Sequence, residues 1–253
     1  MTASPDMIDS LRLRITSWNI HKGIGGVDRQ YRIERVIETL QHQRPDVLLL
    51  QEVAEGMPST LYHNQLEVLS GALGMSHVAY GREHRFRVGG YGNAIISRYP
   101  LTDVQRVDLT IAWRKKRGVI CARAHVPVGE HLRSLVLFNV HLGLAGSERA
   151  AQMQRFLTCH PFAGLHSHTP IVVGGDMNDL WGTIGDRFLS PVGFARAGRR
   201  FNTFPAMLPM RPLDAIYIRG DLRSVHYGPG RGALARSASD HLPLVADLDL
   251  GST

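Results

Sequence analysis

Hydrophobic and polar residues alternate with a period of two near the start of the chain. Between residues 11 and 16 every second side chain is aliphatic, and the others are arginine or threonine. This alternation is typical of a β-strand with one buried face. The pattern leads into Trp18-Asn19-Ile20, and the glycine-rich stretch 21–26 interrupts it. We therefore predict that Asn19 lies where the first strand ends.

The pattern then changes to helical spacing. Apolar side chains recur every three or four residues between Ile33 and Leu40, which predicts a helix. Asp28 is a candidate N-cap of this helix, and Pro45 marks its end. The apolar run 47–50 follows as a buried strand. Glu52 is thereby placed at a second strand end.

The same two periodicities recur in the rest of the chain. A helix carries Leu66, Leu69 and Leu73, and another is capped by Ser147 and buries Met153 and Phe156. Further strands are predicted near residues 91–100, 102–110, 117–126, 133–140, 170–174, 213–218, 223–227 and 242–248.

The order of these elements predicts the fold class. Strands come in pairs that three helices interrupt, and this order differs from the strict strand–helix alternation of a parallel doubly wound sheet. We expect an α/β fold of two packed mixed β-sheets with helices outside. The chain shows no repeat or linker, so residues 1–253 form one predicted domain, with a long basic surface loop at 191–212.

Composition and charge narrow the choice of partners. The chain has 253 residues, 43% apolar and 20% charged, as expected of a globular protein, and its formal charge is +7. This charge favours polyanionic partners such as nucleic acid or anionic phospholipid. Cys121 and Cys159 show no paired spacing, which favours a reducing compartment, the cytoplasm. We expect no signal peptide, no integral membrane segment and a monomer.

Polar side chains gather at the ends of the predicted strands. Each of them alone is typical of a turn. As a set they supply carboxylate and amide oxygens without cysteine, the ligands that suit Mg²⁺ or Mn²⁺. The set comprises Asn19, Glu52, His141, Asp176, Asn178, Asp214, Asp240 and His241.

The stretch Ile171 to Asp179 is the densest of these strand ends. Its two glycines are expected to let the chain bend at the end of the strand. Asp176 and Asn178 stand two residues apart and can then face one cleft. Asp179 is predicted to cap the short segment that follows.

In this order the motifs resemble the endonuclease/exonuclease/phosphatase superfamily, which includes DNase I, exonuclease III, neutral sphingomyelinases and inositol polyphosphate 5-phosphatases. The resemblance covers nearly the whole chain and implies a four-layer α/β sandwich with the site at one edge of the sheets. It rests on Trp18-Asn19, Gln51-Glu52, Gly92-Asn93-Ala94-Ile95, Ser97-Arg98, Asn139-Val140-His141-Leu142, Gly175-Asp176-Met177-Asn178, Leu213-Asp214-Ala215-Ile216-Tyr217 and Ser239-Asp240-His241-Leu242-Pro243.

The resemblance implies a metal site that uses Mg²⁺, with Mn²⁺ as an alternative. Glu52 is similar to the principal metal ligand of the family. Asn19 is similar to the residue that helps to place the metal or the phosphate, and Asp240 to a further carboxylate of the site. Asn93, within its own motif, is expected to contact substrate.

The resemblance also implies catalytic roles for five residues. Asp176 looks like the residue that orients or deprotonates the attacking water, and Asn178 like a phosphate donor. Asp214 looks like the partner that orients His241, and a carboxylate beside a histidine favours the charged imidazole. His141 is expected to donate from the other side.

Other polar features are weaker candidates. The stretch 21–26 lacks the Gly-Lys-Ser/Thr ending of a P-loop and is interpreted as a strand-to-helix turn. His166 and His168 have no third ligand nearby, so a solvated loop is favoured over a metal site. Two basic clusters between strands are candidates for substrate contact, although both are also typical of solvated turns: Arg82, Arg85 and Arg87, and Arg114, Lys115, Lys116 and Arg117.

The details of the motifs favour some branches of the superfamily over others. The apurinic-site endonucleases continue Trp-Asn into Gly-Leu-Arg, whereas this chain has His21-Lys22-Gly23.

The motifs and the charge together predict a metal-dependent hydrolase that cleaves a phosphodiester by in-line water attack. Nucleic acid is the first substrate class, which makes the protein an endonuclease or exonuclease. The alternative is a phospholipid or phosphoinositide phosphodiesterase or phosphatase of the sphingomyelinase-like branch. A remoter alternative is an inert module that binds nucleic acid or membrane.

Overall fold

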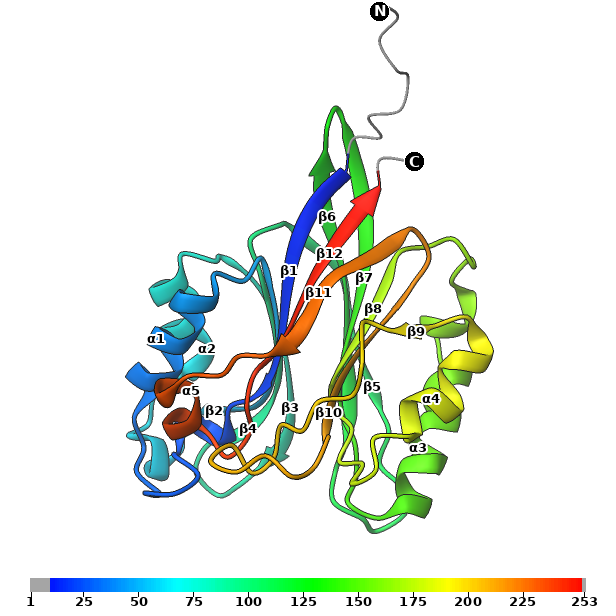
Figure 1. Ribbon diagram of the computed structural model, residues 1–253. Helices are drawn as coiled ribbons and strands as arrows, with labels where there is room; N and C mark the ends of the chain where they lie inside the picture. The colour runs from blue at the N-terminus through cyan, green and yellow to red at the C-terminus, as the bar shows by residue number, and fades with distance from the viewer. Residues whose placement is uncertain (1–9, 252–253) are drawn as a thin grey trace, which may run out of the picture.

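The protein is a sandwich of two β-sheets, seen in a computed structural model that describes residues 10–251 (Figure 1). Each sheet has six strands. Helices α1, α2 and α5 lie outside one sheet, and α3 and α4 lie outside the other. The four layers confirm the predicted α/β sandwich of two packed mixed sheets.

The first sheet contains one parallel pair, β1 with β2, and its other neighbours are antiparallel. In spatial order its strands are β11 (Leu222–Pro229), β12 (Leu244–Gly251), β1 (Ser10–Asn19), β2 (Val47–Glu55), β4 (Gly90–Ser97) and β3 (His77–Arg85).

The second sheet is built in the same way around the parallel pair β7 and β8. In spatial order its strands are β5 (Leu101–Asp108), β6 (Gly118–Val128), β7 (His131–His141), β8 (Ile171–Asp176), β10 (Asp214–Arg219) and β9 (Ala195–Arg196).

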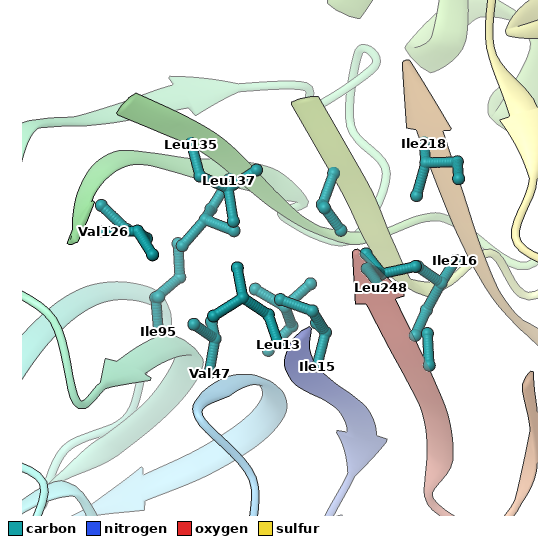
Figure 2. Packing of buried hydrophobic residues seen from close by; sticks show 14 of the residues in the cluster. Leu13, Ile15, Val47, Ile95, Val126, Leu135, Leu137, Ile216, Ile218 and Leu248 are labelled. Carbon is teal, nitrogen blue, oxygen red and sulfur yellow. The ribbon is translucent and has the colours of Figure 1, made fainter. Parts of the chain in front are cut away.

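The largest apolar cluster fills the space between the two sheets. Leu13 and Ile15 of β1 point into it, as the period of two predicts, and meet Leu137 of β7 and Ile216 of β10 (Figure 2). All four side chains are fully buried. Burial of such side chains contributes about 1.5–3 kcal/mol each, so the interface between the sheets holds the strand ends in place.

The helices bury the outer faces of the sheets. The longer ones lie at α1 (Ile33–Gln43), α2 (Gln65–Leu73) and α3 (Gly146–Thr158), and the short ones at α4 (Ile184–Phe188) and α5 (Ala233–Ala238). Short 3₁₀ turns lie at His21–Gly23, Pro58–Thr60, Phe162–Gly164 and Ser190–Val192.

Two predicted helix caps are wrong. Arg32 precedes α1, and the Asp28 carboxylate instead accepts the Gln30 N–H at 3.0 Å within the preceding turn. Ala145 precedes α3, so Ser147 lies inside the first turn of that helix. Neither helix start has a side-chain cap hydrogen bond, and packing of the apolar face stabilises both helices instead.

Strand β3 was not predicted. Its segment His77–Arg85 carries Arg, Glu and His among few aliphatic residues, which is typical of a strand at a sheet edge. Arg82 and Arg85 therefore lie on a strand, not between strands as expected.

The glycines before Asp176 also differ from expectation, because they belong to β8 rather than to a turn after it. A Cβ at Gly175 would lie 1.9 Å from the Val140 carbonyl oxygen, and one at Gly174 would lie 2.7 Å from Leu49 Cδ1. The glycines allow neighbouring segments of the same chain to approach β8 closely, and β8 continues through Asp176.

The parallel pairs bring the polar strand ends together. Strands β1 and β2 run the same way, so Asn19 and Glu52 lie at one end of the first sheet. In the second sheet His141 pairs with Asp176, and Asp176 pairs with Asp214. Both sets lie at the end of the sandwich drawn lowest in Figure 1.

Candidate active site

Asp176 lies at the centre of the polar cluster and is 1% exposed. Its Oδ1 accepts the backbone N–H of Asn178 at 2.8 Å, and its Oδ2 accepts the Asn19 side-chain amide at 3.1 Å. Burial raises the pKa of Asp176 to about 6, although the neighbouring His241 opposes this rise. The carboxylate is held rigidly and titrates close to neutral pH.

His241 lies beside Asp176 and is oriented from behind by Asp214. Its Nδ1 lies 2.9 Å from Asp214 Oδ2, and its Nε2 lies 3.8 Å from Asp176 Oδ2. Burial alone lowers the pKa of His241, but the two carboxylates outweigh burial and raise this pKa to about 10. His241 is therefore a positively charged donor whose Nε2 points toward Asp176.

Thr203 completes the support of this pair. Its hydroxyl donates to Asp214 Oδ2 at 2.5 Å from the loop that precedes β10. The Asp214 carboxylate is thus fixed between a hydroxyl and an imidazole. Thr203 is not among the predicted site residues, because it lies eleven residues before Asp214 in a loop without periodicity.

His141 lies at the end of β7 and approaches Asp176 from this neighbouring strand. Its Nε2 lies 3.5 Å from Asp176 Oδ2. Burial lowers the pKa of His141 well below the usual value, and the positive charges of Arg117 and His241 lower it further. Within the described residues its Nδ1 has no hydrogen-bond partner, whereas that of His241 has Asp214. The two histidines therefore meet the same carboxylate oxygen in different charge states.

Three of these side chains satisfy the spacing of a metal site. One ligand atom each of Asp176, Asp214 and His241 lies within 4.8 Å of the others. A charged imidazole carries protons on both nitrogens and cannot bind a cation. Since Asp214 already accepts from His241, we interpret this trio as a proton-handling group.

Glu52 reaches the site from an irregularity in β2. The pairing of β2 with β4 shifts between Leu50 and Val53, and Glu52 has a positive φ of 55°. Such a bulge redirects a side chain at a strand end. The Lys22 ammonium forms an ion pair with the Glu52 carboxylate. Burial raises the pKa of Glu52, but Lys22 outweighs it, and the net pKa is lowered.

Lys22 was not among the predicted site residues. The stretch 21–26 does form a turn, as interpreted, with a 3₁₀ turn at His21–Gly23. It packs closely on the chain beside His241, because a Cβ at Gly26 would lie 2.7 Å from Asp240 Cα. Its glycines thus permit contact between chain segments, and no P-loop is present in this stretch.

Asp240 and Asn178 lie at the margin of the buried cluster. Asp240 Oδ1 is 3.8 Å from His21 Nδ1, and its side chain is 26% exposed. The Asn178 amide donates to the Leu142 carbonyl at 2.8 Å and joins the turns after β7 and β8. Asp179 accepts the backbone N–H groups of Thr183 and Ile184 at 2.5 and 2.6 Å, at the start of α4.

Asn93 is buried beside the site, and its amide donates to Glu83 Oε1 at 2.9 Å. The same oxygen accepts the backbone N–H of Gly118 at 2.8 Å. Arg117 is also buried and lies 3.9 Å from Glu83. Arg117 is therefore removed from the solvent-facing part of the basic cluster to which the sequence assigned it.

The rest of that cluster is exposed, and the positive charge of Lys115 helps to lower the pKa of Glu52. The ammonium groups of Lys115 and Lys22 lie 5.6 and 4.9 Å from the centre of the Tyr91 ring. Cations at such distances are attracted to the ring face. The Tyr91 ring thus attracts two ammonium groups to positions beside the Glu52 carboxylate. Arg114 and Lys116 are exposed on the same loop, and His166 and His168 lie in a different exposed loop.

The family of the chain is decided by comparison with known proteins. Residues 16–241 match the family model described as the endonuclease/exonuclease/phosphatase family. The chain belongs to this endonuclease/exonuclease/phosphatase family. Members of the family are in general hydrolases of phosphoester bonds that use a divalent metal ion. Every residue of the buried cluster lies within the matched range.

Individual known proteins resemble the chain over most of its length. The uncharacterised protein YbhP of Escherichia coli is 30% identical over 97% of this chain and 100% of its own. A family structure from Beutenbergia cavernae has a TM-score of 0.79 at 22% identity and covers 95% of this chain and 72% of that one. One from Bacteroides vulgatus has a TM-score of 0.75 at 17% identity, with coverages of 95% and 99%.

Between residues 10 and 251, no helix is long and apolar enough to cross a membrane.

Proposed function

We propose that this protein is a divalent-metal-dependent phosphodiesterase that hydrolyses its substrate by in-line attack of water. The observation that carries the proposal is the convergence on Asp176 Oδ2. A charged imidazole of His241 and a neutral imidazole of His141 lie 3.8 and 3.5 Å from this oxygen. The cluster thus places a base beside two groups that can contact a phosphoryl oxygen.

In this proposal Asp176 accepts a proton from the attacking water. A base works best when its pKa lies near the working pH, and the pKa of Asp176 is raised to about 6. Asn19 and the Asn178 backbone hold the carboxylate so that it need not reorganise. Its deprotonated form is then available at neutral pH.

His241 donates a hydrogen bond to a phosphoryl oxygen, whose negative charge grows during attack. Preformed donors in a buried site stabilise such charge more strongly than water does. Asp214 keeps the imidazole protonated and holds its orientation. His141 contacts the opposite side, and the Asn178 amide is a further donor at the turn.

The oxygen-rich donor set at Glu52 fits a hard cation. Its carboxylate stays charged in a largely buried position, and Asp240 and Asn19 are the other ligands that we assign. Oxygen ligands without thiolate suit Mg²⁺, or Mn²⁺ as an alternative. A metal ion held by these residues would neutralise phosphoryl oxygens as a Lewis acid.

The substrate is a polyanion in this proposal. Arg114, Lys115 and Lys116 lie exposed beside the cluster and can contact phosphates, and Asn93 lies behind them. Nucleic acid is the class that the basic charge favours. Exposed apolar side chains such as Trp113 and Leu144 at the same end favour the phospholipid alternative. The free cysteines Cys121 and Cys159 support a reducing compartment such as the cytoplasm, and we propose a monomer.

Replacement of Asp176 by alanine tests the proposal. We expect turnover of a chromogenic phosphodiester with Mg²⁺ to fall by roughly a hundredfold or more, the usual contribution of a general base. The matched control is Asp103→Ala, because Asp103 is an exposed carboxylate near the start of β5, the end of that strand that lies away from the site. Full activity in Asp176→Ala, or an equal loss in Asp103→Ala, would refute the role of Asp176.

A further inference from the structure

We call five of the chain segments at the end of the sandwich that holds the candidate active site the rim: residues 85–89, 109–117, 142–147, 197–213 and 230–239. The pairing registers place them at one end of the sandwich. The start of β4 pairs with the end of β2, the start of β6 with the end of β7, and the start of β12 with β1 near Ser17. The segment 142–147 follows His141, and 197–213 leads directly into Asp214.

The rim exposes large apolar side chains to solvent. Trp113 is 93% exposed, Leu144 74%, Leu208 69%, Met210 59% and Phe86 50%. Single exposed apolar residues are common on soluble proteins, but several at one end usually mark an interaction surface. These five come from four different segments that share only their position around the site.

Positive charge is interleaved with these apolar tips. None of the five segments contains Asp or Glu, and their exposed basic residues include Arg87, Arg114, Lys116, Arg199, Arg200 and Arg231. Apolar tips surrounded by cations are complementary to a bilayer surface that has an acyl interior and anionic headgroups.

A polar pocket of about 510 Å³ lies beside β3, which lines it together with Glu55, Arg106 and Lys116. Its basic lining residues are Arg82, Arg85, Arg106 and Lys116. Of its two acids, Glu55 is paired with Arg82, and burial raises the pKa of Glu83 to about 8. The pocket therefore keeps an excess of positive charge at neutral pH, and its lining residue Arg85 begins the rim segment 85–89.

The type of the apolar side chains separates a bilayer from nucleic acid. Bases stack on aromatic rings, which a nucleic-acid surface would present. Leu144, Leu208 and Met210 have no ring, so they add nothing to stacking. Inserted among acyl chains, they would bury apolar surface, while Trp113 suits the headgroup level.

We propose that the rim docks this protein onto an anionic phospholipid bilayer, with the active site facing the headgroups. The substrate class is then a lipid whose headgroup carries the phosphodiester. This assignment of substrate rests on the proposed phosphodiesterase function, whereas the docking itself does not.

Vesicle binding by the full chain tests the docking. The Asp176→Ala variant is used throughout so that no lipid is turned over. We expect it to sediment with vesicles of phosphatidylcholine and phosphatidylglycerol in equal parts, and weakly with phosphatidylcholine alone. The double change Trp113→Ala and Leu208→Ala should weaken partitioning about tenfold or more, because two side chains no longer enter the bilayer.

The matched control is Leu132→Ala. Leu132 is 67% exposed but lies at the start of β7, at the far end of the sheet. Equal vesicle binding by the double variant and this control would overturn the docking proposal. So would a loss of single-stranded oligonucleotide binding in the double variant without a loss of vesicle binding, which would assign the rim to nucleic acid. Vesicle binding by the Asp176→Ala variant, together with no hydrolysis of any phosphodiester by the native chain, would uphold the docking and refute the proposed function.

Discussion

The two histidines of the cluster differ in one partner, and the replacement Asp214→Asn tests what that partner does. Both Nε2 atoms face Asp176 Oδ2, but only His241 has a carboxylate on its Nδ1, at 2.9 Å. The pKa of His241 is raised to about 10, whereas that of buried His141 lies well below the usual value. His141 thus shows how a histidine behaves here without Asp214.

The size of the effect follows from this comparison. In the Asp214→Asn variant the pKa of His241 should fall to about 6.5 or below, the ordinary value for histidine. At pH 8 the protonated fraction then drops from nearly all molecules to about 3%. We expect kcat/KM of the variant at pH 8 to lie about thirtyfold below that of the native protein at the same pH, in which His241 is still protonated.

The assay is a pH profile of kcat/KM on a chromogenic phosphodiester. In the native protein the acidic limb should lie near pH 6, where Asp176 loses its proton, and the alkaline limb near pH 10. Thr203→Val is the control, because it removes one hydrogen bond to Asp214 but leaves both charges. An alkaline limb that stays near pH 10 in Asp214→Asn would refute the assigned role of this pair.

Two further changes test the metal site and the support beneath it. Glu52→Gln should weaken Mg²⁺ binding, measured by calorimetry, by more than roughly tenfold, whereas the control Glu55→Gln on the same strand should leave it unchanged. Equal Mg²⁺ affinities of the two variants would show that Glu52 is not a metal ligand. Asn139→Ala should lower the free energy of unfolding by about 3 kcal/mol in urea, because the Asn139 amide donates at 2.8 Å to the carbonyls of Leu50 and Ala94 and both buried hydrogen bonds would be lost. Exposed Asn202→Ala is its control, and an unchanged midpoint would contradict this reasoning.

The sequence was sufficient to predict those site residues whose position follows from local periodicity and strand direction. The alternation before Asn19 and the apolar runs before His141 and Asp176 identified strands. These strands belong to parallel pairs, whose ends share one sheet edge, so the polar residues that follow them meet. Asp214, which begins β10, joins them through its pairing with Asp176.

Other features depend on contacts between distant segments, which a single sequence does not encode locally. Lys22 reaches Glu52 only because β1 and β2 lie side by side. Thr203 reaches Asp214 through an irregular loop, and Arg117 is buried because Glu83 lies on the unpredicted strand β3. The glycine at position 175 also depends on a contact with a distant segment, because the neighbouring strand β7 leaves no room for a side chain there.

The central claim is that this cluster hydrolyses a phosphodiester with the help of a divalent metal. The most direct measurement offers the purified chain plasmid DNA, abasic DNA, RNA, sphingomyelin, anionic phospholipids and chromogenic phosphate mono- and diesters. Each substrate is measured with Mg²⁺, then with excess chelator, then with Mg²⁺ or Mn²⁺ restored. We predict cleavage of at least one diester that the chelator abolishes and the metal restores. Cleavage that persists in the chelator, or no cleavage of any diester with either metal, would contradict the account.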